Sequence, residues 1–310
     1  MKKKIFIDGR AGTTGLRIEE RLSGRDGVEL ISLPEELRKD TEARREMLNT
    51  ADVVFLCLPD EAAKEAVSMI TNESTVVIDA STAHRTNPDW AYGFPELSAE
   101  HEEKIKRSHR IAVPGCHASG FIALVYPLVK AGILPSDAII SAHSITGYSG
   151  GGKSMIADYE AKERSALLGA PRQYGIAQSH KHLPEMVKIA GLKRAPVFSP
   201  IVADFYSGME VTVPICKEQL TFGGIEDIKN IYRAAYNTQI IKFRQSADEG
   251  GFLSAGALSG KDTMEISAYG NDDRIILVAR YDNLGKGASG AAVECLNIKL
   301  GSDKAEGLEI

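Results

Sequence analysis

The first 22 residues limit the fold of this chain more than any other stretch. An apolar run at residues 5–7 is followed by a turn with glycines at positions 9, 12 and 15, and residues 16–22 then have helical spacing. A strand, a glycine-rich turn and a helix in this order form the first unit of a dinucleotide-binding fold, in which a pyrophosphate lies on the helix N-terminus. The spacing is G-x-x-G-x-x-G instead of G-x-G-x-x-G, so a plain strand-to-helix turn is the alternative.

Apolar runs that alternate with helical segments continue through the first third of the chain. Their alternation predicts a doubly wound parallel sheet, hence an α/β fold. The runs lie at residues 28–33, 51–58, 74–79 and 110–113. The later strands are spaced as in mixed or antiparallel sheets, and they are expected at residues 138–147, 200–205, 209–215, 265–269 and 274–281, with one helix at 225–236. A second, α+β domain is therefore expected, with one face of its sheet toward solvent or a partner subunit.

Composition excludes several classes of partner. The net charge of −5 gives no bulk attraction to nucleic acid or to an anionic membrane. The longest apolar segment, residues 121–134, is interrupted by Pro127, Lys130 and Gly132, so no membrane span is expected. The apolar run after the basic N-terminus is too short for a signal peptide, and the four cysteines form no C-x-x-C pair. We expect a cytoplasmic protein with free thiols and two domains.

The stretch from residue 110 to 121 carries the strongest chemical signal. A β-branched run ends at Pro114 and Gly115, and the apolar helix after it would begin at Cys116. The first N–H groups of a helix lack internal partners and the helix dipole is positive there, so a thiolate at this position is stabilised and becomes a usable nucleophile. Gly115 would allow a strained turn that exposes the sulfur. The alternative is a small buried cysteine that only packs.

Residues near the carboxyl ends of the first strands are expected to bind a dinucleotide cofactor, because open α/β sheets bind ligands there. Ser32 and Arg38 follow the second strand, and a hydroxyl with a cation suits the 2′-phosphate of NADP, although Glu35 and Glu36 act against it. A solvated helix face is the alternative for Arg38. The full set of expected cofactor ligands is Gly9, Gly12, Thr13, Thr14, Gly15, Ser32, Arg38, Ser81, Thr82 and Asn283.

Separate arguments support three of these cofactor ligands, and also Arg85 as a ligand of cofactor or substrate. Ser81, Thr82 and Arg85 follow the strand at 74–79, where cofactor or substrate would bind, and a structural salt bridge is the alternative for Arg85. Asn283 offers both a donor and an acceptor, which suits a carboxamide such as that of nicotinamide. Small residues follow it, so tight packing of the last helix on the sheet is the alternative.

A second chemical cluster consists of His180, His182 and Glu185. Because a helix is expected to start at Pro184, the three side chains share a turn that could aim them together. The favoured interpretation makes His180 an acid–base group, with Glu185 fixing its tautomer. A polar surface turn is the second interpretation, and a metal site through the two histidines is the third. Two histidines alone do not close a zinc site, so no metal is expected.

Residues 147–154 match the phosphate-loop pattern G-x-x-x-x-G-K-[ST]. Small residues there would expose N–H groups, and we expect Ser149 and Gly150 to contact substrate, with Arg85 and His182 as further candidates for holding a phosphate. The loop lies mid-chain, with no aspartate-bearing strand of the Walker type after it. A flexible active-site loop is therefore favoured over the loop of a phosphotransferase.

Four motifs, taken in order, resemble one known family. They extend over nearly the whole chain and are Gly9-x-x-Gly12-x-x-Gly15, Pro114-Gly115-Cys116, His180-x-His182-x-Pro184-Glu185 and Asn283-x-x-Lys286-Gly287-Ala288. Their order is similar to that of the short-form N-acetyl-gamma-glutamyl-phosphate reductases, within the wider aspartate-semialdehyde dehydrogenase group. His117, Ala118 and Ser119 stand where longer members commonly have Tyr-Pro-Thr.

The resemblance implies an architecture and an activity. The architecture is a Rossmann-type NADP(H)-binding domain at 1–115, completed by a C-terminal helix at 286–310, with an inserted α+β catalytic and dimerisation domain at 116–285. The activity is NADPH-dependent reductive dephosphorylation of N-acetyl-L-glutamyl 5-phosphate in arginine biosynthesis, through a Cys116 thioester with His180 as proton carrier, in a homodimer or homotetramer. The alternatives are the same chemistry on an aspartyl or carrier-bound aminoadipyl phosphate, or a non-catalytic NADP-binding regulator.

Overall fold

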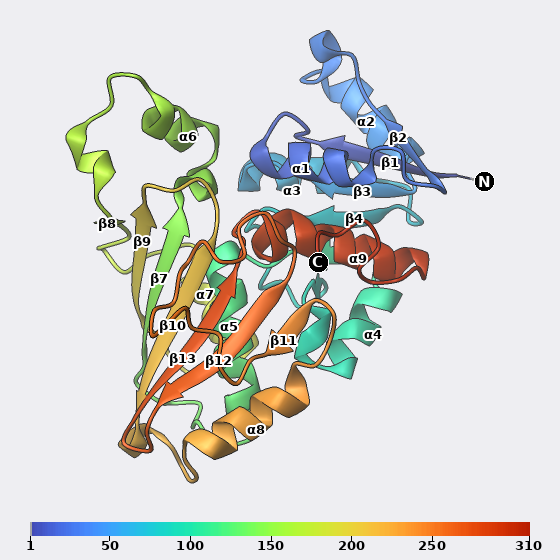
Figure 1. Cartoon of the computed structure of the whole chain (residues 1–310). Coiled ribbons are helices and arrows are strands. Elements are labelled where there is room, and N and C mark those ends of the chain that lie inside the picture. Colours follow the sequence, from blue (N-terminus) through green and yellow to red (C-terminus); the bar gives the residue numbers. More distant parts are fainter. Residues whose placement is uncertain (1) are drawn as a thin grey trace. The chain divides into compact units, whose positions relative to one another are not determined.

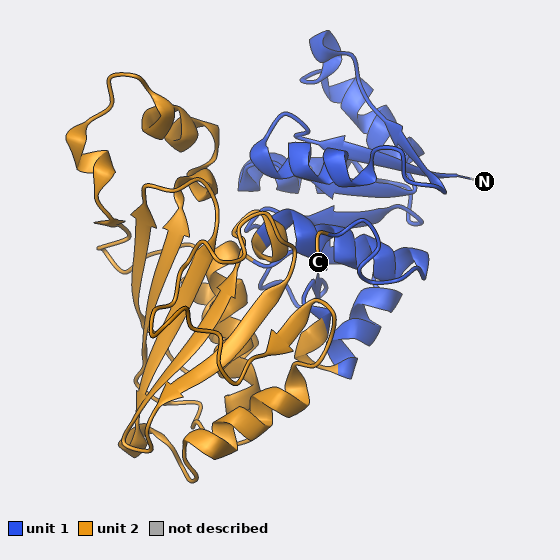
Figure 2. Ribbon diagram, viewed as in Figure 1, with its two compact units in different colours: residues 1–95, 99–114, 288–308 blue, residues 96–98, 115–287, 309–310 orange. Residues whose placement is uncertain are grey.

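The computed structural model describes residues 2–310 and divides into two compact units, shown in Figures 1 and 2. Unit 1 comprises the chain up to Pro95, residues 99–114 and residues 288–308, and unit 2 comprises residues 96–98, 115–287 and 309–310. Met1, where the first predicted domain begins, lies outside the described residues. The long segment of unit 2 therefore begins directly before Cys116, and the chain returns to unit 1 at Ala288. No helix within residues 2–310 has the length and apolar character to cross a membrane.

Unit 1 is built on a parallel sheet with the strand order β2-β1-β3-β4-β6-β5. Its strands are β1 (Lys3–Asp8), β2 (Val28–Ile31), β3 (Val53–Leu56), β4 (Val76–Asp79), β5 (Ala91–Tyr92) and β6 (Arg110–Ala112). Its helices are α1 (Thr13–Leu22), α2 (Thr41–Thr50), α3 (Asp60–Met69), α4 (Ala99–Arg107) and α9 (Gly290–Leu300). The predicted parallel α/β sheet is confirmed. The strand order reverses between β1 and β3, so the turn after β1 lies at the point where such sheets bind ligands.

Helices cover both faces of this sheet, and the burial of β3 and β4 along their whole length follows from that. On one face, Ile5 of β1 and Ile78 of β4 share a core with Val293 and Leu296 of α9. On the other face, a second core joins the sheet to α2 and α3. The last helix of the chain thus packs on the sheet that the first residues begin.

Unit 2 is built on a mixed sheet with the strand order β11-β12-β13-β10-β7-β9-β8. Its strands are β7 (Ser141–Gly147), β8 (Arg172–Gln173), β9 (Val197–Ala203), β10 (Met209–Cys216), β11 (Ile241–Phe243), β12 (Met264–Gly270) and β13 (Arg274–Tyr281). Its helices are α5 (Cys116–Lys130), α6 (Gly152–Glu160), α7 (Leu183–Ala190) and α8 (Ile225–Ala235). β7 pairs with β9 in parallel and with β10 in antiparallel, as a mixed sheet requires.

One face of the second sheet packs on helices, and α5 is the central one. Its side chains are buried on nearly all sides, since it contacts β10, β13, α7 and α8. Along β10, Val211 and Val213 are buried while Glu210 and Thr212 of the other face are half-buried. Two apolar side chains of the uncovered face are exposed, Val197 of β9 at 58% and Ile276 of β13 at 44%. This sheet therefore has the one open face that the alternating pattern predicts.

Two local expectations were wrong. The strand expected at 200–205 begins at Val197 and ends at Ala203, because its register is set by pairing along the whole of β7. The flexible loop expected around 148–154 is a 3₁₀ turn, Tyr148–Gly151, followed by helix α6. Gly152, at φ +72°, supplies the backbone conformation that joins the two helical segments.

Candidate active site

Helix α5 begins at Cys116, as the motif predicts. Gly115 is the N-cap residue, and neither a side-chain cap nor an acidic residue occupies the first turn. The positive end of the helix dipole therefore lies at Cys116, where it favours a negative charge. Cys116 is half-buried and forms no disulfide. The expected strain at Gly115 is absent, since its φ of −75° and ψ of 145° are ordinary extended values that other residues also adopt.

Tyr281, at the end of β13, holds this first turn in place. Its buried hydroxyl donates a hydrogen bond to the Cys116 carbonyl at 2.5 Å and accepts one from the Gly120 N–H at 3.0 Å. Gly120 has to be small, because a Cβ atom there would lie 2.7 Å from the Tyr281 ring and 2.7 Å from a methyl group of Val211. The sheet of unit 2 therefore fixes the backbone that carries the cysteine.

Glu185 joins the two predicted motifs. Its buried carboxylate accepts a hydrogen bond at 2.8 Å from the N–H of Gly115, the residue before the cysteine. The sequence pattern predicts that Glu185 binds the His180 ring and fixes its tautomer. In the structure that task falls to a backbone group, since Nδ1 of His180 accepts the N–H of His182 at 3.1 Å. Nδ1 as an acceptor leaves the hydrogen of the neutral imidazole on Nε2.

The histidines form one cluster beside the start of α5. The His180 and His182 rings are edge-on with centroids 4.7 Å apart, and the His117 ring lies 5.5 Å from the first and 5.7 Å from the second. Burial, with a smaller contribution from Lys181, lowers the pKa of His180 to about 4. His180 is therefore neutral at pH 7. Within residues 2–310 no group of three or more metal-ligating side chains is placed to hold a metal ion.

His117 is the main functional candidate that the sequence interpretation missed. Its Nδ1 lies 2.7 Å from the hydroxyl oxygen of Ser144, and its Nε2 lies 2.6 Å from that of Tyr174. Burial is the largest cause that lowers the pKa of His117 to about 3, and His180 adds to it. Ser144 could have been found, because the alternation in β7 places it on the buried face with Ala142. Tyr174 follows a short strand that no sequence pattern predicted.

The segment after β13 packs closely on the cysteine. A Cβ atom on Gly287 would lie 3.1 Å from that of Cys116, so the small residue there is required for the approach. Nearby, Lys286 and Glu96 form a buried ion pair, with the Lys286 nitrogen 2.8 Å and 2.9 Å from the two carboxylate oxygens. Asn283 was expected to bind a carboxamide. In the structure its amide donates to Ser149 Oγ at 3.0 Å and accepts from the Gly208 N–H at 2.9 Å, so it ties two loops together.

The phosphate-loop match is a coincidence of sequence. The N–H groups of Gly147, Tyr148 and Ser149 donate to carbonyls of residues 208, 205 and 206, at 2.9–3.0 Å. A phosphate loop instead directs such N–H groups at its ligand. Ser149 is also fully buried, whereas Gly150 is exposed. The first three N–H groups of the match are therefore engaged with the 205–208 backbone and cannot face a nucleotide phosphate.

The glycine turn of unit 1 fits a dinucleotide. At Gly9, φ is +87° and a Cβ atom would lie 2.3 Å from the Cys57 carbonyl oxygen, and at Gly15 it would lie 2.7 Å from the Gly9 carbonyl oxygen. Gly12 is the N-cap of α1, which has no side-chain cap and no acid in its first turn, where Thr13 and Thr14 lie half-buried. The N-terminus of α1 thus offers N–H groups to an anion such as a pyrophosphate.

The other expected ligands of unit 1 have protein partners. The Ser81 hydroxyl donates to Asp79 at 2.7 Å, and the N–H and hydroxyl of Thr82 both bind Asp60, so these side chains hold the turn after β4. Arg85 is buried, and its guanidinium donates to the Val113 carbonyl at 2.8 Å and to the Ala80 carbonyl at 3.0 Å. These two contacts position Arg85 at the carboxyl ends of β4 and β6.

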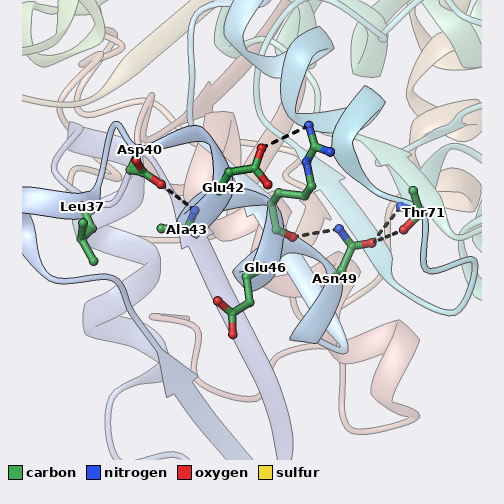
Figure 3. Close-up of a pocket in the computed structure, with 8 residues that line it drawn as sticks. Leu37, Asp40, Glu42, Ala43, Glu46, Asn49 and Thr71 are labelled. Carbon is green, nitrogen blue, oxygen red and sulfur yellow. Dashed lines mark hydrogen bonds and ion pairs between the residues drawn. The ribbon is translucent and has the colours of Figure 1, made fainter.

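The two residues expected at a 2′-phosphate lie after β2. Ser32 follows the strand directly and is exposed. Arg38 is exposed as well and forms an ion pair with Glu35 at 2.7 Å, which is the solvated alternative. Figure 3 shows a neighbouring surface pocket along α2, lined by Leu37, Asp40, Glu42, Ala43, Arg45, Glu46, Asn49 and Thr71. Its three carboxylates disfavour a phosphate ligand.

Comparisons with known proteins agree with this geometry. Residues 6–105 match the family model described as semialdehyde dehydrogenase, NAD binding domain, and residues 116–283 match semialdehyde dehydrogenase, dimerisation domain. The chain is 44% identical to the N-acetyl-gamma-glutamyl-phosphate reductase of Sinorhizobium medicae, over 97% of this chain and 99% of that protein. It is 45% identical to the protein of the same name from Brucella ovis, over 97% of this chain and 100% of the other.

Solved structures share the fold at low sequence identity. Aspartate semialdehyde dehydrogenase II from Vibrio cholerae, solved as a complex with ASA, superposes with a TM-score of 0.74 at 18% identity, over 97% of this chain and 98% of that one. The aspartate semialdehyde dehydrogenase of Candida albicans, solved with NADP, superposes with a TM-score of 0.65 at 16% identity, over 96% and 98% of the two chains.

Proposed function

Because the chain belongs to the semialdehyde dehydrogenase family, and within it to the N-acetyl-gamma-glutamyl-phosphate reductases, we propose that it reduces N-acetyl-L-glutamyl 5-phosphate to N-acetyl-L-glutamate 5-semialdehyde with NADPH, releasing phosphate. This reaction belongs to arginine biosynthesis. The observation that carries the proposal is the contact between the two chemical motifs, in which Glu185 binds the Gly115 N–H beside Cys116. A thiol at a helix N-terminus, next to a histidine cluster, is what acyl transfer to sulfur requires.

Cys116 is the proposed nucleophile. Its thiolate attacks the acyl carbon of the substrate, the carbon–oxygen bond to phosphate breaks, and a thioester on Cys116 remains. The uncapped N–H groups at the start of α5 would stabilise the oxyanion of each tetrahedral stage. NADPH, when bound, supplies the hydride that reduces the thioester, and the carbon–sulfur bond then breaks to release the aldehyde and the thiolate.

His180 is the proposed proton carrier. Its Nδ1 accepts the His182 N–H and its pKa is lowered to about 4, so the neutral ring carries its hydrogen on Nε2. That hydrogen can be donated to the developing oxyanion. A protonated His180 ring would carry a hydrogen on Nδ1 as well, and this hydrogen would point at the N–H of His182. Glu185 acts on the backbone of the cysteine turn. His182, Arg85, Ser149 and Gly150 remain proposed substrate ligands.

The cofactor proposal is NADP(H). The residues that support it are the turn with Gly9, Gly12, Thr13, Thr14 and Gly15, which fits a pyrophosphate at α1. Ser32 and Arg38 are proposed for the 2′-phosphate, which would replace Glu35 as the partner of Arg38. Ser81, Thr82 and Asn283 have internal partners, so any contact they make with the cofactor would come from groups not engaged in those bonds.

A homodimer is the proposed minimal assembly. The family model over residues 116–283 is a dimerisation domain, and one face of the unit 2 sheet is uncovered and carries Val197 and Ile276. A second copy of the same face would bury these side chains. A tetramer would need a further interface. We also place the protein in the cytoplasm, where its four free cysteines would stay reduced.

One assay tests the proposed function. Phosphate-dependent reduction of NADP⁺ is measured with N-acetylglutamate semialdehyde, and in parallel with aspartate semialdehyde and the carrier-bound aminoadipate semialdehyde. A kcat/KM at least a hundredfold higher for the first substrate supports the proposal. A preference for either of the other two assigns the same chemistry to a different acyl group. NADPH binding without turnover of any substrate would identify a regulator and overturn the proposal.

A further inference from the structure

A chain of three side chains runs through unit 2 beside the proposed nucleophile. The Ser144 hydroxyl lies 2.7 Å from Nδ1 of His117, and the Tyr174 hydroxyl lies 2.6 Å from Nε2. His117 follows Cys116 directly in the first turn of α5. The three residues come from α5, from β7 and from the segment after β8, so strand pairing and helix packing bring them together.

Burial decides the direction of the hydrogen bonds in this chain. Ser144 is fully buried, and among the described residues its hydroxyl has one hydrogen-bond partner, Nδ1 of His117. A buried hydroxyl whose hydrogen has no acceptor is unfavourable, because it has lost its hydrogen bond to water. The favoured arrangement therefore has Ser144 donating to Nδ1, which leaves the imidazole hydrogen on Nε2 and directs it to the Tyr174 oxygen.

This direction leaves the hydrogen of the Tyr174 hydroxyl available to another molecule. The oxygen of Tyr174 already accepts from His117, and no other side chain of residues 2–310 is hydrogen-bonded to it. Tyr174 is only partly buried, and it packs in a small core with Tyr159, Leu168 and Val202 that fixes its ring. Burial, with the charge of Cys116 adding to it, raises the pKa of Tyr174, so the hydroxyl keeps its hydrogen at neutral pH.

We propose that Tyr174 donates a hydrogen bond to an oxygen atom of the acyl group that is bound at Cys116, and that Ser144 and His117 are positioning residues that set the direction of this donor. The proposal rests on the proposed function, because it assigns a contact to the substrate of that reaction. The alternative tautomer, with the hydrogen on Nδ1, makes Tyr174 a donor to His117 and leaves nothing for the substrate. The two arrangements therefore make opposite predictions.

The tautomer can be measured without substrate. With ¹⁵N-labelled histidine in the full-length enzyme, we expect the His117 nitrogens to show an unprotonated Nδ1 and a protonated Nε2 from pH 6 to 9. His117→Gln identifies the signals. A protonated Nδ1 overturns the proposal. This readout depends on neither turnover nor the identity of the acyl group, so it separates failure of this inference from failure of the proposed function.

Kinetics test the contact itself. Tyr174→Phe removes only the hydroxyl, and we expect the KM for the acyl phosphate to rise about tenfold while the KM for NADPH stays the same. Tyr148→Phe is the matched control, because its hydroxyl lies on the surface and meets Glu160 at 3.4 Å. An unchanged KM for the acyl phosphate in Tyr174→Phe overturns the proposal.

The role of His117 is tested by a pair of substitutions. His117→Leu removes the donor to Tyr174, and we expect it to raise the KM for the acyl phosphate as much as Tyr174→Phe does. Gln can place an amide N–H near the position of Nε2, so His117→Gln should recover most of the difference. Equal losses in both variants would assign His117 to packing and overturn its positioning role. If a His117 variant does not fold, Ser144→Ala gives the same test, because it removes the donor to Nδ1 and keeps the imidazole ring. An unchanged KM for the acyl phosphate in Ser144→Ala counts against the proposal.

Discussion

The carboxylate of Glu185 accepts a hydrogen bond from the N–H of Gly115, which lies 70 residues away in the sequence. Glu185→Ala should lower the free energy of unfolding by about 1–3 kcal/mol, because a buried N–H loses its acceptor. Glu185→Gln keeps an acceptor oxygen and should lose less. Urea denaturation of the three proteins measures the difference. Equal losses in both variants would mean that the charge of Glu185, and not this hydrogen bond, stabilises the turn.

Cys116→Ser should abolish turnover and leave NADPH binding unchanged, because the hydroxyl is a far weaker nucleophile than a thiolate. Cys216→Ser is the control, since Cys216 is exposed at the end of β10 and remote in sequence from both motifs. Steady-state rates and NADPH fluorescence titration give the two readouts. Substantial activity in Cys116→Ser would remove Cys116 as the nucleophile.

His180→Ala should reduce kcat by about 10²–10⁴-fold, the usual size of a general acid–base contribution. His109→Ala, on the surface of unit 1, should have no effect. Single-turnover rates with a saturating acyl phosphate would separate chemistry from binding. If His182→Ala shows the large fall and His180→Ala does not, the roles of the two histidines are exchanged.

Acidification should destabilise the protein through His117. Its pKa is about 3 in the folded chain and near 6.5 when unfolded, so between these values the unfolded state binds more protons. Above pH 6.5 this difference in bound protons is absent. Below pH 6.5 the free energy of unfolding falls by up to about 1.4 kcal/mol per pH unit. His117→Gln cannot titrate and should show a shallower loss between pH 6.5 and 4 in urea denaturation. Parallel curves for the two proteins would contradict this.

Two glycines of the first turn should respond differently to alanine. Gly9→Ala should destabilise unit 1 strongly, because φ is +87° and the Cβ atom would lie 2.3 Å from a carbonyl oxygen. Gly12→Ala meets no atom closer than 3.4 Å, so it should fold normally. It should nevertheless weaken NADPH binding about tenfold, because the methyl group would narrow the space proposed for the pyrophosphate at the start of α1. Thermal unfolding and NADPH titration distinguish the two effects.

Much of the architecture could be predicted because it depends on patterns short in sequence. The apolar runs and the glycines at 9, 12 and 15 predict the strand, turn and helix that the structure contains at the start of unit 1. The start of α5 at Cys116 follows in the same way from Pro114, Gly115 and the apolar segment after them.

A local pattern does not show which tertiary contacts its groups will make. The match at 147–154 has the composition of a phosphate loop, but its first three N–H groups bind the 205–208 backbone, which the sequence could not show. Asn283 has the right chemistry for a carboxamide, and in the structure it also donates one hydrogen bond to Ser149 and accepts one from Gly208. A sequence pattern indicates which polar groups are present, but it does not indicate which hydrogen-bond partners they have in the folded chain.

Local sequence is sufficient to predict the α/β fold, the glycine turn and the cysteine at the start of a helix, because hydrophobic periodicity and backbone conformation act over a few residues. Three contacts are seen only in the folded chain: Glu185 binds Gly115, Tyr281 holds the Cys116 turn, and His117 lies between Ser144 and Tyr174. These contacts join residues 27 to 165 positions apart, so they depend on how strands pair and helices pack. Burial in the folded chain also lowers the pKa of His117 and of His180.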